Sequence, residues 1–278
     1  MDRFDWLELT PLRPAVAPVE PLLRPPSDGP TFFRAARSFR ENAHFRNAAD
    51  CYARSLGFDE RNYIAWVELV DTLVRARLLE EAEARSKEAF DNYRQVRLFY
   101  ASRALVLAHS NALVDAWPLS DISIESSDHW YPRLVRAELL LRTARENLAG
   151  ALNLCEETLD RHPDTWDVLL LSGWLLLDNE FPAHAAGYFS EAAHRQPRSL
   201  VAWLGLGDCF QSLRLYDQAL FYYQRALEIE PKHELALERQ RRCIPRRFGL
   251  VRLFRPEDLR RRWSRAFEKE QGVAHSDE

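Results

Sequence analysis

The sequence is poor in the residues that build disulfide frameworks and glycine-rich phosphate loops, and it lacks long apolar runs. It has four cysteines, nine glycines and one methionine among 278 residues. The cysteines lie far apart without a C-x-x-C pair, so we expect buried reduced thiols. No run approaches the roughly 18 apolar residues of a membrane span, and the start MDRFDW lacks the pattern of a signal peptide. These absences predict a cytoplasmic protein.

Motifs that carry catalytic chemistry are also missing. The chain contains no P-loop and no G-x-G-x-x-G, G-x-S-x-G or H-E-x-x-H pattern. Eight histidines are scattered along it, and none has a second ligand type at metal spacing. We therefore expect a protein that is not an enzyme and that holds no metal and no cofactor. The sequence alone leaves open a catalytic site formed by residues that are distant in sequence and meet only in the fold.

What the sequence has instead is a repeat. Six alanines recur at intervals of 34, 34, 35, 34 and 34 residues. A period near 34 indicates a helical hairpin that is repeated and stacked, because a lone hairpin cannot bury its apolar face. A small residue once per unit predicts a close contact between two helices, which a larger side chain would push apart. The six are Ala48, Ala82, Ala116, Ala151, Ala185 and Ala219.

Other positions keep the same register, most clearly toward the C-terminus. With repeats that begin at residues 29, 63, 97, 132, 166 and 200, the thirty-second place holds Pro163, Pro197 and Pro231, each suited to end a helix. The last unit, WLGLGDCFQSLRLYDQALFYYQRALEIEP, closely resembles a tetratricopeptide repeat. In the third unit Pro118 is expected to interrupt the second helix, so we predict an irregular or shortened repeat there.

This resemblance implies an all-α fold. We expect a right-handed superhelical solenoid of about six tetratricopeptide-type hairpins, followed by C-terminal capping helices. The expected segments are a Pro-rich extended N-terminal arm over 1–28, the solenoid over 29–233, and a capping helix with an Arg-rich amphipathic helix and tail over 234–278. The repeats are placed near 29–62, 63–96, 97–131, 132–165, 166–199 and 200–233.

The resemblance also implies protein binding, since superhelices of this family usually bind along an inner surface lined by the first helix of each hairpin. The Lys and Asn residues that clamp chaperone tails in some members are absent from the inward places, which are mostly apolar. An apolar groove means either an array that coils tightly or is filled by its own arm or C-terminal helix, or a site for a hydrophobic segment of a partner. The candidate groove residues are Ile64, Val67, Leu98, Leu105, Arg133, Arg136, Leu140, Leu170, Trp174, Leu177, Val201 and Leu204.

The C-terminal tail supports an alternative partner. Residues 239–269 hold twelve basic residues against three acidic ones, although the whole chain has a net charge of −4. Such a segment could bind nucleic acid or another polyanion, or it could pair with acidic parts of its own chain. Contact with a membrane surface is allowed but less expected. The candidate basic residues are Arg241, Arg242, Arg246, Arg247, Arg252, Arg255, Arg260, Arg261, Arg262 and Arg265.

The sequence thus favours a protein–protein interaction scaffold or adaptor that works as a subunit of a larger assembly. Three alternatives are open for the N-terminal arm. It packs along its own solenoid, it docks a partner as a linear motif, or it is disordered. The partner itself is a protein whose identity the repeat pattern does not encode.

Overall fold

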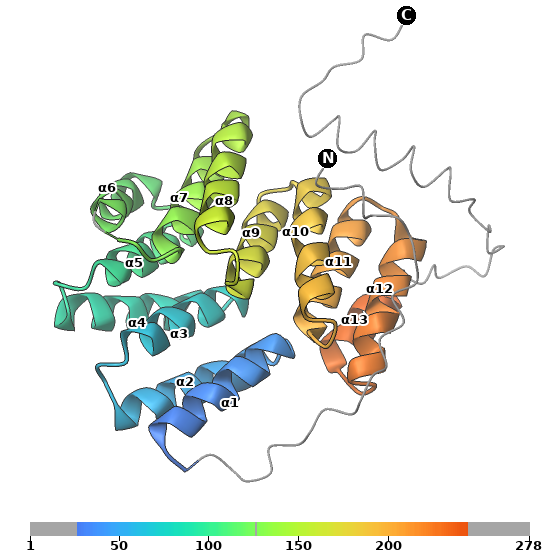
Figure 1. The fold of residues 1–278 in the computed structure, drawn as a ribbon, viewed down its shortest axis with the longest axis horizontal. Coiled ribbons are helices and arrows are strands. Elements are labelled where there is room, and N and C mark those ends of the chain that lie inside the picture. The colour runs from blue at the N-terminus through green and yellow to red at the C-terminus, as the bar shows by residue number, and fades with distance from the viewer. Residues whose placement is uncertain (1–26, 126, 244–278) are drawn as a thin grey trace, which may run out of the picture. The chain divides into compact units, whose positions relative to one another are not determined.

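The computed structural model describes residues 27–125 and 127–243, and all regular structure in them is helical (Figure 1). The described chain divides into two compact units. We call residues 27–175 without residue 126 the N-unit, and residues 176–243 the C-unit. The predicted all-α fold is confirmed, whereas nearly all of the N-terminal arm and the tail beyond residue 243 lie outside the described residues.

Every predicted repeat contains two α-helices in the described chain, and successive helices pack against each other from α1 to α8 and from α10 to α13. The boundary between the units falls within α9. In chain order the elements are α1 Gly29–Glu41, α2 Phe45–Phe58, α3 Tyr63–Arg75, α4 Leu79–Asn92, α5 Arg97–His109, α6 Leu113–Ile124, α7 Tyr131–Thr143, the 3₁₀ turn η1 Arg145–Asn147, α8 Leu148–Arg161, α9 Trp166–Asp178, α10 Pro182–Arg195, α11 Leu200–Ser212, α12 Tyr216–Ile229 and α13 Glu234–Cys243.

The recurring alanine marks the same structural place in every hairpin. It is the fourth residue of the second helix in each of the six pairs. All six side chains are 0 % exposed, which confirms that the period reflects buried helix contacts. A larger side chain at any of these places would have to displace a packed neighbour.

Most of the turns inside the hairpins share one backbone conformation. Five of them contain a non-glycine residue with φ between 56° and 67°, the left-handed region. The following residue donates its backbone N–H to a carbonyl five residues earlier, as from Leu78 to Leu73 at 2.9 Å and from Leu215 to Phe210 at 2.8 Å. This closure satisfies the last carbonyls of the first helix and reverses the chain within a few residues. The left-handed residues are Ala43, Arg77, Asn111, Glu180 and Arg214.

The prolines act differently at the two kinds of position. Pro163, Pro197 and Pro231 each lie two residues beyond the end of a second helix, as predicted. The prediction that Pro118 interrupts its helix is wrong, because α6 runs through it. Pro118 is exposed, so water can satisfy the carbonyl that loses its helical partner. The second helix of the third repeat is nevertheless shorter than the others, since α6 has 12 residues and the other second helices have 14.

The interior of the N-unit contains an ionic cluster around Glu138, which is 2 % exposed. Its carboxylate lies 2.6 Å from His109 Nε2, 3.0 Å from Arg142 Nη2 and 3.4 Å from Arg75 Nη2. Burial alone would raise the pKa of Glu138, but His109 and the two guanidinium groups outweigh burial and hold it well below its ordinary value of 4.5. Glu138 therefore stays ionised although it is buried.

In the C-unit, α11 approaches its neighbours so closely that glycine is required. A Cβ at Gly205 would lie 2.6 Å from Phe189 Cδ1, and one at Gly207 would overlap the ring of Tyr223. Both rings are 0 % exposed and cannot swing into solvent. The Gly205→Ala substitution should therefore destabilise the protein by about 1–3 kcal/mol through overpacking. Urea unfolding followed by circular dichroism measures the change.

Gly57 provides the matched control, because it is an exposed helical glycine whose added Cβ would meet no atom within 4 Å. The Gly57→Ala substitution should raise the free energy of unfolding by about 0.5–1 kcal/mol, the ordinary gain of alanine over glycine in a helix. Equal effects of the two substitutions would contradict the close approach of α11 to Phe189.

The Glu138→Gln substitution should destabilise the protein by about 3–5 kcal/mol, because it leaves buried guanidinium groups without their counter-charge. Because the pKa of Glu138 is lowered by folding, its contribution is complete above its ordinary value of 4.5 and is lost as the pH falls below that value. Between pH 5 and pH 3 the urea midpoint should therefore fall more steeply for the wild type than for the variant. The difference should correspond to the protonation of a single carboxylate.

The exposed pair of Glu157 and Arg161 on α8 serves as the control for this experiment. The Glu157→Gln substitution should change the free energy of unfolding by less than about 1 kcal/mol, because exposed pairs contribute little. A Glu138→Gln variant as stable as this control would show that the buried cluster does not stabilise the fold.

Candidate functional site

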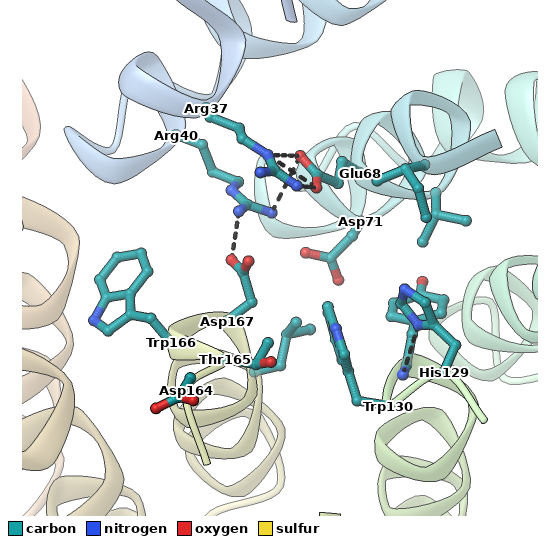
Figure 2. Close-up of a pocket in the computed structure, with 14 residues that line it drawn as sticks. Arg37, Arg40, Glu68, Asp71, His129, Trp130, Asp164, Thr165, Trp166 and Asp167 are labelled. Atoms are coloured by element: carbon teal, nitrogen blue, oxygen red, sulfur yellow. Dashed lines mark hydrogen bonds and ion pairs between the residues drawn. The ribbon is translucent and has the colours of Figure 1, made fainter. Parts of the chain in front are cut away.

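A cavity of about 310 Å³ opens within the N-unit (Figure 2). Four segments contribute to its wall: α1, α3, the connection from α6 into α7, and the connection from α8 into α9. The lining residues are Arg37, Arg40, Ile64, Val67, Glu68, Asp71, His129, Trp130, Tyr131, Asp164, Thr165, Trp166, Asp167 and Leu171.

Helical spacing explains why these side chains meet. The residues that α3 contributes, Ile64, Val67, Glu68 and Asp71, lie at positions i, i+3, i+4 and i+7 and share one face of the helix. All the contributing α-helices are the first helices of their hairpins. The cavity therefore lies on the side of the stack that the repeat pattern assigns to the inner surface.

A buried ion pair joins the first and fifth repeats across the cavity. Arg40 on α1 is 5 % exposed and donates through Nη2 to Asp167 on α9. Two further contacts hold α9 against the first repeats: Trp174 lies edge-on to Phe45 with ring centroids 5.9 Å apart, and the Arg75 guanidinium lies 5.4 Å from the ring centroid of Trp174. The N-unit is thus coiled tightly enough for its fifth repeat to touch its first.

Glu68 has a full set of partners. Arg37 Nε lies 3.1 Å from both carboxylate oxygens, the Tyr52 hydroxyl donates to Oε2 at 2.6 Å, and Arg40 Nη1 lies 4.0 Å away. Burial would raise the pKa of Glu68, but Arg40 and Arg37 lower it below its ordinary value. This carboxylate is ionised and structurally occupied.

Asp71, one turn along α3, has no such set. It is 2 % exposed, and neither of its oxygens has a hydrogen-bond partner in the described residues. Arg75 Nη2 lies 3.6 Å from Oδ1, too far for a hydrogen bond. Burial raises the pKa of Asp71 in spite of Arg75 and Arg40. Figure 2 shows its carboxyl group directed into the open middle of the cavity.

The remaining wall is mostly aromatic, and it also contains the exposed acid Asp164. Trp130 lies beside His129 and Tyr131, with ring centroids 5.0 Å and 5.7 Å apart. His129 accepts the backbone N–H of Tyr131 through Nδ1 at 3.2 Å, and burial lowers the pKa of this histidine. Since His129 is neutral near pH 7, the charged lining residues are four carboxylates against two guanidinium groups.

The structure brings only two of the predicted groove residues, Ile64 and Val67, to this cavity. Arg136 instead pairs with Asp121 on α6 and lies over the ring of Trp117. Several others are core residues, namely Leu105, Leu170, Val201 and Leu204. The rest are half-buried, namely Leu98, Arg133, Arg136, Leu140, Trp174 and Leu177.

The charged character of the cavity differs from the apolar groove that we expected. Sequence reasoning passed over Arg40 and Glu68, which form the centre of the ionic network. The available signal was two acids three residues apart in the otherwise apolar helix YIAWVELVDTLVR. Acids at that spacing share one face, so a helix buried on that face needs charged partners from elsewhere in the chain.

Of the predicted basic-tail residues, Arg241 and Arg242 lie exposed on α13, where Arg242 pairs with Glu238. The other eight lie outside the described residues: Arg246, Arg247, Arg252, Arg255, Arg260, Arg261, Arg262 and Arg265. Across the part of the chain that the structure describes, no helix is both long and apolar enough to cross a membrane.

Comparison with known proteins bears on the repeat directly. Residues 201–233, which span α11 and α12, match the family model described as tetratricopeptide repeat. No curated protein matches the sequence.

Several solved structures resemble the chain. YrrB, a TPR protein with an unusual peptide-binding site, is 16 % identical, covers 69 % of this chain and 99 % of its own, and gives a TM-score of 0.41. A thermophilic TPR protein of Thermus thermophilus is 15 % identical over 77 % of this chain and 98 % of its own, with a TM-score of 0.43. A tetratricopeptide repeat protein from Parabacteroides merdae is 13 % identical over 90 % of this chain and 94 % of its own, with a TM-score of 0.41.

The match covers the hairpin of α11 and α12, and the same hairpin, with its buried alanine, recurs through the described residues. The chain is therefore a tetratricopeptide repeat protein.

Proposed function

We propose that this protein is a non-enzymatic scaffold or adaptor and that the cavity of the N-unit is where it holds a segment of a partner protein. The observation that supports this most strongly is the convergence of the first helices of several hairpins on one cavity with aromatic walls and a buried carboxylate that lacks a hydrogen-bond partner. An unsatisfied buried polar group opposes folding, and such groups concentrate where a protein binds something.

The proposed binding surface differs from the apolar groove that the sequence favours. Leucine and valine side chains at the expected inward places are largely buried in the core, so they offer little surface to a partner. Two half-buried indoles, Trp130 and Trp166, line the cavity instead. Burying part of a tryptophan contributes strongly to binding, and tryptophan is enriched among the residues that dominate interfaces. The proposed partner segment therefore contacts both aromatic and charged side chains in the cavity.

The function of a scaffold in a larger assembly makes a specific prediction for Trp130. The Trp130→Ala substitution should lower the recovery of co-purifying partners at least tenfold, because it removes one aromatic wall of the cavity. Recovery is measured by quantitative mass spectrometry after affinity purification of the full chain from its native cell. Helical circular dichroism should stay unchanged.

Trp117 is the matched control, since it is also half-buried but lies on α6 away from the cavity, where its Nε1–H donates to Thr143 at 3.2 Å. The Trp117→Ala substitution should leave partner recovery as in the wild type. Equal recovery by both variants, with both folded, would refute the cavity as the site of partner binding.

The surplus of basic residues over 239–269 supports a second proposal, that the C-terminal tail binds nucleic acid or another polyanion. Replacing Arg260, Arg261 and Arg262 by Gln in the full chain should weaken filter binding of single-stranded RNA and reduce the dependence of affinity on salt by roughly 0.7 per neutralised phosphate. The control replaces Arg85, Arg94 and Arg161, which are exposed arginines of the N-unit, by Gln. Equal salt dependence of the two triple variants would exclude the tail as the binding segment.

A further inference from the structure

The cavity contains one buried carboxylate that receives no hydrogen bond from the described residues. Every nearby guanidinium group has a closer acid than Asp71. Arg40 donates to Asp167, Arg37 donates to Glu68, and Arg75 Nη2 lies nearer to Glu138 than to Asp71, at 3.4 Å against 3.6 Å. Asp71 is the acid left over when these pairs are formed.

The surroundings of Asp71 favour a positively charged occupant. Four carboxylates and two guanidinium groups line the cavity, and burial keeps His129 neutral near pH 7. Asp164 adds an exposed negative charge to the same wall. A cation that enters would be attracted by the surplus negative charge and would meet a carboxylate that has already lost its water.

The geometry distinguishes between kinds of cation. Both oxygens of Asp71 lack hydrogen-bond donors, which matches the two parallel N–H groups of a guanidinium better than the single point charge of an ammonium. In Figure 2 the Trp130 side chain lies beside the middle of the cavity near Asp71, where an indole face can stack on a planar guanidinium, whereas the Trp166 ring lies beyond Asp167 and points away from Asp71. The volume of about 310 Å³ falls at the lower end of the range of roughly 300–1,000 Å³ for ligand pockets.

We propose that this cavity binds a guanidinium group, with the two oxygens of Asp71 as its bidentate acceptor and the indole of Trp130 as its stacking wall. A guanidinium is thus the proposed ligand of the cavity. That this guanidinium belongs to a partner segment rests on the proposed function. An arginine side chain on the partner would then fill the position that the protein's own arginines leave open.

A different role for Asp71 makes the opposite prediction about stability. If Asp71 served only as the helical i,i+4 partner of Arg75, its removal would cost stability, because a buried guanidinium would lose a counter-charge. If Asp71 is held for a ligand, its replacement by the neutral isostere should leave the free protein equally stable or stabilise it, because a buried carboxylate without donors is removed.

The test uses the full chain with ¹⁵N-labelled indoles and follows the Trp Nε1–H resonances as probes are added. N-acetyl-arginine N-methylamide should shift the resonance of Trp130 saturably, with its assignment from the Trp130→Phe variant. The citrulline analogue, which has the same shape without the charge, should bind at least tenfold more weakly. The lysine analogue should lie between them.

The Asp71→Asn variant should bind the arginine probe at least tenfold more weakly while its urea midpoint is equal to or above that of the wild type. The matched control is Asp115→Asn, an exposed acid of α6, which should change neither quantity. Absence of saturable shifts with the arginine probe, equal affinity for citrulline, or unchanged affinity in Asp71→Asn would each overturn the proposal. The first two outcomes are read on the wild type and do not depend on the variant folding.

Two further results separate this inference from the proposed function. Guanidinium chloride at equal concentration tests the source: weaker binding than the peptide-like probe supports an arginine side chain, whereas equal binding indicates a free guanidinium compound and overturns the partner origin. Loss of partner recovery in Trp130→Ala without any response to the arginine probe would leave the scaffold function standing and refute the guanidinium site alone.

Discussion

The buried alanine at the fourth place of each second helix is the constraint on which the remaining structure depends. All six methyl groups are fully buried, so a larger side chain would have to displace a packed neighbour, and the contact recurs at the same place in each hairpin. Because the hairpins are alike, the first helices of successive repeats present equivalent faces. Arg40, Asp71 and Asp167 come from three different repeats, and regular stacking is what allows their side chains to line one cavity.

The buried acids of the N-unit differ in the number of hydrogen-bond donors around them. Glu138 and Glu68 are each surrounded by arginine, histidine or tyrosine donors, and folding lowers the pKa of both. Asp71 is equally buried, but its oxygens lack donors and its pKa is raised. Desolvation penalises all three carboxylates, so what separates them is the number of donors that the fold supplies. This contrast between two satisfied acids and one unsatisfied acid beside a cavity supports the proposed role of Asp71 in binding.

The sequence predicted the architecture well because the periodic signals are local. The alanines, the helix-ending prolines and the resemblance of residues 200–233 to a tetratricopeptide repeat each depend on neighbours within one hairpin. The cavity was missed because it depends on how far the stack coils. Arg40 and Asp167 lie 127 positions apart, and no local pattern states that they meet. Nor does a local pattern show that Asp167 accepts a hydrogen bond from Arg40 while the oxygens of Asp71 accept none from the described residues.

The contact between α1 and α9 has a consequence for how the N-unit comes apart. In a linear array each repeat touches only its neighbours, so a terminal repeat can fray while the others persist. Here the opening hairpin is also held to the fifth by the Arg40 ion pair and by Trp174 against Phe45. Detaching that hairpin must break contacts at both ends of the unit at once. Loop closure over so many residues slows assembly, yet it converts a chain of independent modules into a body that melts as a whole.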